Sequence, residues 1–358
     1  MKKRVVFSLL LPGLLAALSA GTGAQSDDES QFRVVVDLVQ LNIAVTDKNG
    51  NYVTGLRPSD FVIKEDDIPQ KVATFAEGNE PTRRVSDLPP ANAASTPVGG
   101  GVPGVSSILT PGTPETLGTA IAGANVYILF DTSNYMYRGF VYAQDAISDF
   151  VRSLETPDKI AFYSYSRNLS RAAPLTADRS SVVRGVRTTV AGDDAAFYNS
   201  LLMTVKDASR IVGRKVVVVF SNGPDNASTV PPEDVAELAQ SSGIPIYMIS
   251  TREARLEPVS TAVFERMTAA TGGKAYFSKN WRDEKKAFAS IRDDLGHLYS
   301  LSYYPKPNPN RGWRSIEVKL VGEKLKGFRI RTRNGYRPLP NRFSAAGEPT
   351  ARLSAMPE

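Results

Sequence analysis

The stretch Asn125-Val-Tyr-Ile-Leu-Phe-Asp-Thr-Ser-Asn134 decides the fold of this chain. Its five consecutive apolar residues, 126–130, predict a strand that is buried on both faces, as parallel strands in α/β sheets are. The apolar run stops at Asp131, and Ser133 follows two residues later. Because open α/β sheets place their ligand crevice at the carboxyl ends of such strands, these two side chains are the first candidates for a site.

Strand and helix patterns alternate after this stretch. A second buried strand is predicted at residues 215–221, where four consecutive valines precede a phenylalanine. Further strands are expected at residues 159–165, 169–175 (a short edge strand), 244–250 and 273–277, and helices at residues 140–154, 178–189, 197–212, 231–242, 259–271 and 283–296. This alternation predicts a doubly wound, mostly parallel, Rossmann-like α/β sheet over residues 123–297, with helices on both faces.

The segments that flank this α/β domain have β patterns. Residues 31–80 predict a small β-sandwich-like module, with a turn at Asp47-Lys-Asn-Gly50 that explains Asp47 and Asn49 better than calcium binding does. Residues 298–338 predict an antiparallel β appendage that packs against this module. Residues 81–122 are rich in Pro, Gly, Ser, Thr and Ala, which predicts a flexible linker, and the polar tail 339–358 is expected to be disordered.

The first residues of the chain have the pattern of a secretory signal peptide. A basic start, Met1-Lys-Lys-Arg4, is followed by an apolar run and by small residues that end near Ala24. The run is short for a membrane span, which needs about 20 residues. We therefore predict a signal peptide at residues 1–24, a secreted or periplasmic protein, and no transmembrane segment once the signal is removed.

Composition excludes several kinds of chemistry. The chain has no cysteine and one histidine, so disulfides, thiolate metal sites and thiol catalysis are excluded. His297 is expected to be structural, and no Gly-x-Ser-x-Gly or phosphate-binding glycine loop is present. The formal net charge of +6 comes without a basic run, so no nucleic-acid partner is expected. We predict that the protein is not an enzyme.

Taken together, these patterns resemble a von Willebrand factor type A domain from about residue 125 to residue 295. The wider layout is similar to that of the VWFA-related proteins of acidobacterial secretomes. The residues that carry this second resemblance are Thr46-Asp47, Gly50, Val53, Gly55-Leu56, Phe61-Val-Ile-Lys-Glu-Asp66, Tyr299-Ser-Leu-Ser-Tyr-Tyr-Pro305 and Arg333-Asn-Gly-Tyr336.

The resemblance implies a metal-ion-dependent adhesion site, built from Asp-x-Ser-x-Ser, a threonine of a second loop and an aspartate of a third. Asp131 and Ser133 match its first two ligands. The remaining three positions are taken by Tyr135, Ala195 and Asn222.

Three carboxylates that could substitute for the missing ligands lie close to these positions in the sequence, those of Asp193, Asp194 and Asp225. Two alternatives follow: four carboxylates that converge on Ca²⁺ or Mg²⁺, or a metal-free, vestigial site in which Asp131 and Ser133 cap the next turn. No cofactor is certain from the sequence.

The function implied by the resemblance is that of a non-catalytic, adhesion-type module that binds a protein partner of unknown identity. Tyr135, Tyr137 and Asn222 are the candidate partner-binding residues, because they lie near the predicted crevice and tyrosine suits partly wet interfaces. Tyr142 is a further candidate anchor of this kind. The alternative function is a structural or assembly component of the cell envelope that acts through its β modules, with an idle site in the α/β domain.

Overall fold

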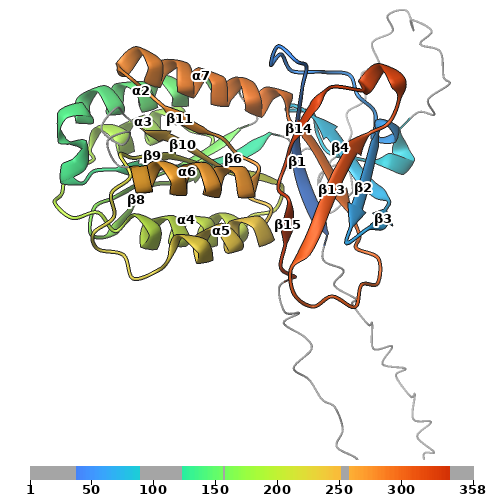
Figure 1. The fold of residues 1–358 in the computed structure, drawn as a ribbon. Coiled ribbons are helices and arrows are strands. Elements are labelled where there is room, and N and C mark those ends of the chain that lie inside the picture. Colours follow the sequence, from blue (N-terminus) through green and yellow to red (C-terminus); the bar gives the residue numbers. More distant parts are fainter. Residues whose placement is uncertain (1–37, 89–122, 156–157, 251–257, 339–358) are drawn as a thin grey trace, which may run out of the picture. The chain divides into compact units, whose positions relative to one another are not determined.

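A six-stranded sheet lies at the centre of the α/β domain within the described residues, in the order β11-β10-β9-β6-β7-β8 (Figure 1). Its strands are β6 (Ala124–Asp131), β7 (Lys159–Tyr165), β8 (Leu169–Thr176), β9 (Arg214–Phe220), β10 (Ile246–Ser250) and β11 (Ala275–Phe277). β8 pairs antiparallel with β7, and the other neighbours pair parallel. The predicted doubly wound, mostly parallel sheet is confirmed, and β6 is apolar from Val126 to Phe130 because helices cover both faces of the sheet.

The structure is a computed structural model that describes residues 38–88, 123–155, 158–250 and 258–338, all of which belong to one compact part of the chain. The predicted signal peptide, the tail 339–358, most of the predicted linker and the start of the first β segment lie outside the described residues. Among the helices that are described, none has both the length and the apolar character that a membrane crossing requires.

Helices cover both faces of the α/β sheet (Figure 1). One face carries α2 (Phe140–Ser153), α3 (Arg179–Arg187) and α7 (Trp281–His297), and the other carries α4 (Phe197–Ser209), α5 (Pro232–Ser241) and α6 (Pro258–Thr271). A 3₁₀ segment, η3 (Asn134–Gly139), connects β6 to α2. Helix α7 starts after Asn280, whose side chain accepts hydrogen bonds from the next backbone N–H groups, as a capping residue does.

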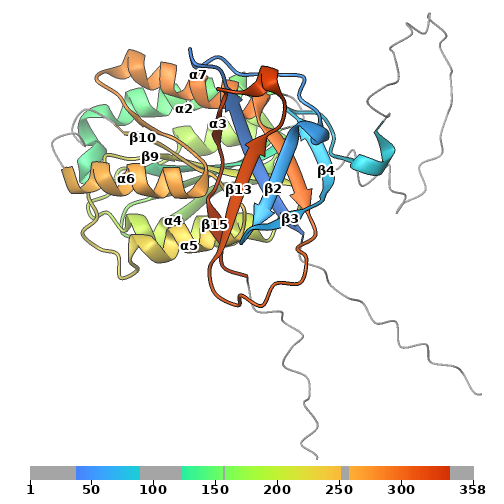
Figure 2. The ribbon, with the colours of Figure 1, turned by 45° about the vertical axis from the view of Figure 1, so that its right-hand side comes forward.

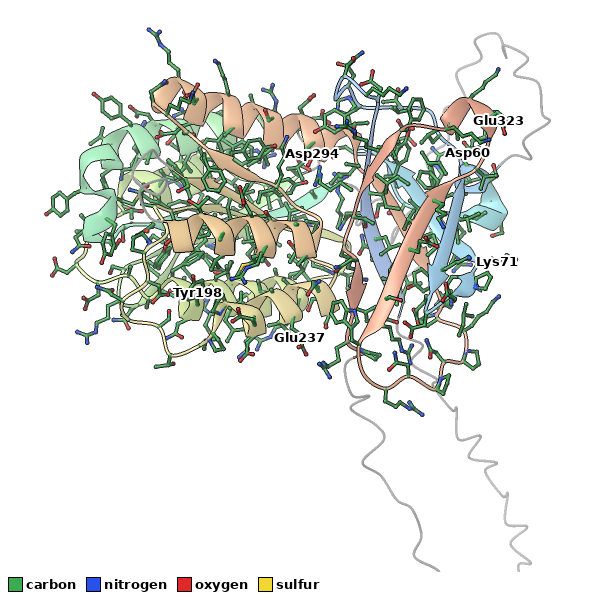
Figure 3. All side chains as sticks on the ribbon, in the orientation of Figure 1. Asp60, Lys71, Tyr198, Glu237, Asp294 and Glu323 are labelled. Carbon is green, nitrogen blue, oxygen red and sulfur yellow. The ribbon has the colours of Figure 1, made fainter. Side chains whose placement is uncertain are left out.

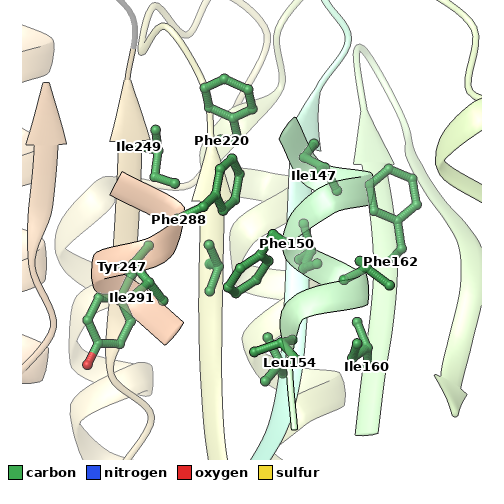
Figure 4. Close-up of a cluster of buried hydrophobic side chains, with 14 of the residues drawn as sticks. Ile147, Phe150, Leu154, Ile160, Phe162, Phe220, Tyr247, Ile249, Phe288 and Ile291 are labelled. Atoms are coloured by element: carbon green, nitrogen blue, oxygen red, sulfur yellow. The ribbon is translucent and has the colours of Figure 1, made fainter. Parts of the chain in front are cut away.

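Each face of the sheet has its own apolar core. Phe130 and alternate residues before it pack beneath α2 and α7, while Leu129 and Tyr127 pack beneath α4. Figure 4 shows the first of these cores, where the rings of Phe150 and Phe288 lie 5.0 Å apart between the two helices. These aromatic contacts fix α7 against α2 and the sheet.

The segments before and after the α/β domain form one β-sandwich. One sheet has the order β14-β1-β12-β4-β5 and the other β15-β13-β2-β3. The strands are β1 (Val39–Thr46), β2 (Phe61–Glu65), β3 (Ile68–Gln70), β4 (Val72–Glu77), β5 (Arg83–Arg84), β12 (Tyr299–Tyr303), β13 (Arg314–Leu320), β14 (Arg329–Arg331) and β15 (Gly335–Tyr336). Short 3₁₀ segments are η1 (Pro58–Asp60), η2 (Val85–Asp87) and η5 (Glu323–Leu325).

Both sheets contain strands from the segment before the α/β domain and from the segment after it. β12 lies between β1 and β4. β13 pairs with β2, and these two strands lie side by side in Figure 2. Residues of both sheets, among them Leu41, Ile63 and Leu301, share one apolar core. The β module and the β appendage predicted separately are therefore two parts of one sandwich, and the α/β domain is inserted between them.

The sequence motifs of the sandwich meet at Glu65. This carboxylate is fully buried and accepts hydrogen bonds from Tyr303 Oη at 2.8 Å and Tyr336 Oη at 3.0 Å. Arg314 Nη1 lies 2.9 Å from its other oxygen. A buried carboxylate requires such partners, so the Phe-x-Ile-x-Glu, Tyr-Tyr-Pro and Gly-Tyr motifs form one polar cluster although they are far apart in sequence.

A second buried carboxylate joins the sandwich to the α/β domain. Asp294, labelled in Figure 3, lies in the last turns of α7 and has no exposed surface. Arg331 of β14 donates to both of its oxygens, at 2.6 and 2.5 Å, and Tyr52 Oη donates at 2.8 Å. Tyr247 of β10 also donates to it. Helix α7 is therefore tied to the sandwich through a charged, hydrogen-bonded cluster.

Asp47 and His297, for which the sequence suggested structural roles, both make structural contacts. Asp47 accepts hydrogen bonds from the backbone N–H groups of Asn49 and Asn51, at 2.8 and 2.9 Å, which is the geometry of a turn. The ring of His297 stacks on that of Tyr52, with centroids 5.0 Å apart, and Nδ1 lies 2.7 Å from the carbonyl oxygen of Asp293. These contacts agree with the structural roles expected for both residues.

Replacing Arg331 by Met should lower the free energy of unfolding by about 3 kcal/mol, because Asp294 would remain buried without its cation. Urea unfolding measures this change. The double variant Asp294→Asn/Arg331→Met is the matched control and should recover at least half of the loss, since no unpaired charge is left. A single variant within about 0.5 kcal/mol of the native protein would show that this ion pair does not hold the two parts together.

The pKa of Asp66 leads to a prediction of how the stability of the sandwich depends on pH. Burial by itself raises the pKa of Asp66, but hydrogen bonds from Ser315 and from the Asn308 and Asn310 side chains lower it to about 2. A carboxyl whose folded pKa is below its unfolded value stabilises the fold above the unfolded pKa and loses this effect as pH falls. Asp66→Asn should therefore be less stable than the native protein at neutral pH, because the new amide would face the donors of both asparagines.

The difference between Asp66→Asn and the native protein should shrink as pH falls from about 4 to about 2. Urea titrations at several pH values follow it. A difference that stayed constant over this range would rule out the ionised Asp66 as its source.

Candidate functional site

Four buried polar side chains lie in a row across the carboxyl ends of neighbouring strands. Asp131 ends β6 and pairs in register with Tyr165 of β7. Ser221 directly follows β9 and Ser250 ends β10, and the pairing of Phe220 with its neighbours in β6 and β10 places both serines level with Asp131. Polar residues at this edge of a parallel sheet occupy the position where α/β domains bind their ligands.

Hydrogen bonds connect three members of this row. Tyr165 Oη donates to Ser221 Oγ at 2.9 Å, and Ser221 Oγ donates to Asp131 Oδ2 at 2.7 Å. The backbone N–H of Ser133 donates to the other Asp131 oxygen at 2.9 Å, and Gly223 N–H donates to Ser221 Oγ at 3.0 Å. Because Ser221 already accepts two hydrogen bonds, its single proton is directed at Asp131, which serves as the acceptor at the end of the chain.

Burial raises the pKa of Asp131, and the hydrogen bonds from Ser133, Ser221 and Tyr165 oppose this effect. Burial, followed by the nearby Asp131 carboxylate, also raises the pKa of Tyr165 well above its usual value. Tyr165 therefore remains a neutral hydrogen-bond donor at physiological pH.

Ser133 differs from Tyr165 and Ser221 in this network. Its side chain is 1% exposed and lies beside Asp131, whose pKa it helps to lower. Its hydroxyl makes no hydrogen bond of good geometry with the other described residues.

The substitute carboxylates do not gather around Asp131. Asp193 is exposed, and Asp194 Oδ2 lies 3.5 Å from Arg167 in a surface ion pair. Asp225 accepts hydrogen bonds from the backbone N–H of Tyr198 at 2.9 Å and of Ser228 at 2.8 Å. In the described part of the chain, no three acidic or histidine side chains are arranged to hold a metal ion together.

The donor set fits the vestigial alternative better than a bound divalent cation. Both Asp131 oxygens already accept protein hydrogen bonds, and Asp225 is held at the start of α4. Tyr135 and Ala195 occupy positions where the family pattern has hydroxyl ligands. Magnesium requires a near-ideal octahedron of oxygens, which these residues do not provide.

Asn222 and Asn226 connect the loops around the site. Asn222 is 3% exposed, and its amide donates to the carbonyl oxygen of Tyr135 at 2.5 Å. Asn226 Oδ1 accepts from Ala195 N–H at 2.8 Å. Sequence reasoning missed Asn226 and Ser221. Ser221 could have been found, because it follows its apolar strand as Asp131 follows β6, whereas nothing in the spacing marks Asn226.

The outer surface of this edge carries an exposed aromatic patch, which we define as Tyr135, Tyr137, Val141 and Tyr142. Their exposed fractions are 38%, 66%, 62% and 60%, in the same order. All four belong to η3 or to the first turn of α2. Tyr135 and Tyr137, predicted as partner-binding residues, thus have accessible rings, while Asn222 is buried beneath them in a supporting position.

The fold is that of an α/β domain with a row of buried polar residues at the carboxyl edge of its sheet, the edge where such domains bind ligands. Residues 125–290 match the von Willebrand factor type A domain. This part of the chain is therefore a von Willebrand factor type A domain, as the sequence resemblance implied. Among curated proteins, none matches the chain.

Several solved structures are similar to part of the chain. BatB from Bacteroides thetaiotaomicron is 16% identical with a TM-score of 0.41, over 48% of this chain and 97% of that one. The vWF domain of the type V pili tip protein Mfa5 from Porphyromonas gingivalis is 11% identical with a TM-score of 0.43, over 52% and 98%. Proximal thread matrix protein 1 from the mussel byssus, solved with a zinc-occupied MIDAS motif, is 12% identical with a TM-score of 0.41, over 53% and 49%.

Ser221→Ala should lower the free energy of unfolding by about 2 kcal/mol or more, because Tyr165 Oη and Gly223 N–H would lose their acceptor inside the protein. Ser250→Ala is the matched control: its hydroxyl is equally buried but has no partner among the described residues, so its removal should change stability by less than about 0.5 kcal/mol. Urea unfolding compares the two. Equal losses would show that the hydrogen-bonded row contributes nothing specific.

Proposed function

We propose that the chain is a non-catalytic module that binds a protein partner through the aromatic patch at the carboxyl edge of its A domain. The observation that carries the proposal is the exposure of three tyrosines and a valine in η3 and the start of α2, the segment that follows the buried Asp131 in the chain. Domains of this type are generally interaction modules without catalysis.

The physical chemistry of the patch supports this function. Tyrosine combines a large apolar ring with a polar tip, so it loses little when exposed and gains when a partner covers it. Interfaces are enriched in such residues, and a few of them usually supply most of the binding free energy. Charged residues occur on the same elements: exposed Asp193 is hydrogen-bonded through its backbone to Asn134 of η3, and Asp145 of α2 forms an ion pair with Arg187.

The N-terminal sequence supports a secreted or periplasmic location for this activity. Its basic start, apolar run and small residues follow the order of a secretory signal. The absence of cysteine from the whole chain means that folding in an oxidising compartment cannot produce wrong disulfides. The partner is then a protein of the envelope or of the surroundings of the cell.

A bound Ca²⁺ or Mg²⁺ is not required by this proposal. If a cation did bind, Asp131 and Ser133 would be its ligands among the described residues, and the remaining positions would have to be filled by water.

The test is binding by variants that leave the buried network intact. Immobilised native protein, the double variant Tyr137→Ser/Tyr142→Ser and the control Tyr304→Ser would be exposed to envelope and extracellular fractions of the source cells. The recovered partner would then be purified and its dissociation constant measured. Tyr304 is 55% exposed on the sandwich, so it matches the patch residues in chemistry and accessibility.

The double variant should weaken binding by about tenfold or more, and Tyr304→Ser should leave it unchanged. Unchanged binding by the double variant, together with loss of binding in Tyr304→Ser, would instead favour the alternative in which the protein acts as an envelope component through its sandwich.

A further inference from the structure

We propose that protein hydrogen bonds in this A domain take the place of a cross-linking cation, so that its partner-binding face is assembled without any metal ion. One consequence of this inference rests on the proposed function: partner binding should not depend on divalent cations. It concerns three loops: the first (residues 132–139), the second (188–196) and the third (221–231). A cation with ligands in all three would hold them together, and here each pair of loops is joined by protein atoms.

The third loop holds the first through Asn222. The Asn222 amide donates to the carbonyl oxygen of Tyr135, a residue of the aromatic patch. Ser221 also donates to Asp131, the last residue of β6 before the first loop. An aspartate at position 222 could not make the first of these contacts, because an ionised carboxylate has no proton to donate and would be repelled by the carbonyl oxygen. The change that removes a metal ligand of the family pattern therefore supplies a loop-to-loop hydrogen bond.

The second loop is joined to the first through the backbone. Gly192 N–H donates to the carbonyl oxygen of Thr132 at 2.7 Å, and Asn134 N–H donates to that of Asp193 at 3.1 Å. These two bonds place the second loop beside η3, where the patch begins.

The third loop is joined to the second mainly through Asn226. Its side chain accepts from Ala195 N–H at 2.8 Å, and its own N–H donates to the Ala195 carbonyl oxygen at 3.1 Å. Asp225 extends the connection into α4 by accepting from the N–H of Tyr198, which is labelled in Figure 3. Helix α4 begins after Ala196, which has no side chain for capping, so Asp225 supplies the acceptor from another loop.

The three connections close a ring: third loop to first, first to second, and second to third. Thr132, Ala195 and Asn222 are buried, which protects their side of these hydrogen bonds from water, whereas Asn226 and Asp193 are exposed at the surface. Asn222 and Asn226 are the positioning residues of this arrangement, since neither belongs to the exposed patch and each connects two loops.

The first measurement compares thermal unfolding of the native protein in EDTA and in millimolar Mg²⁺, Ca²⁺ and Mn²⁺. The native protein should unfold at the same temperature in all of them, within about 1 °C. The comparison variant, Tyr135→Ser/Ala195→Thr/Asn222→Asp, restores the ligand types of the family pattern. It should be less stable in EDTA and gain about 3 °C or more with one of these cations.

The second measurement does not need the triple variant to fold. Hydrogen exchange of the backbone amides in the first and second loops should be the same with EDTA and with metal in the native protein. It should increase by about tenfold or more in Asn222→Ala and Asn226→Ala, whereas Ser250→Ala, a buried control outside the ring, should leave it unchanged.

A metal-dependent rise in unfolding temperature of the native protein, or loop exchange that is slowed by metal, would overturn the inference. Unchanged loop exchange in both asparagine variants would overturn it as well. Neither measurement involves a partner, so each can fail while binding by the aromatic patch stands, and the patch variants can fail while the ring of loop contacts stands.

Discussion

Strand β12 follows the A domain in the chain, but the two strands with which it pairs, β1 and β4, precede that domain. It lies between β1 and β4 and hydrogen-bonds to both, so β4 lacks this partner until residue 303 has been added, and β1, which also pairs with β14, lacks a complete set of partners until residue 331. The same constraint governs the buried charges. Glu65 needs Tyr303, Arg314 and Tyr336, and Asp294 needs Arg331, all of which come late in the chain. In the chain, the A domain is thus inserted between the two halves of a sandwich whose sheets are completed only by strands that follow it.

The order of strands and helices in the A domain could be predicted because its signals are local. Apolar runs mark β6 and β9, and helical periodicity marks α2 and α7, with boundaries that differ from the structure by at most two residues. The sandwich was harder to predict. Its pairings join residues more than 200 positions apart, such as Leu41 with Leu301, and alternation within a strand does not say which strand will be its neighbour. The break between β3 and β4 at Lys71 is likewise invisible in the alternating pattern.

The candidate site could be predicted in part for the same reason. Asp131 and Ser133 follow a buried strand, so their position at the sheet edge follows from the local sequence. Where a loop carboxylate points depends on which donors compete for it. Asp225 was a reasonable metal ligand by spacing, but the uncapped start of α4 offers it backbone N–H groups. Asp194 faces Arg167 instead. Such competition between near neighbours in space has no sequence signature.

Helix α7 runs into β12 with a single residue, Leu298, between them. Leu298 is buried with the core of the A domain, and the next residue, Tyr299, is buried in the core of the sandwich. Tension applied to the A domain would therefore enter the sandwich through a strand with antiparallel neighbours on both sides. Two ladders of hydrogen bonds, one to β1 and one to β4, would share the mechanical load.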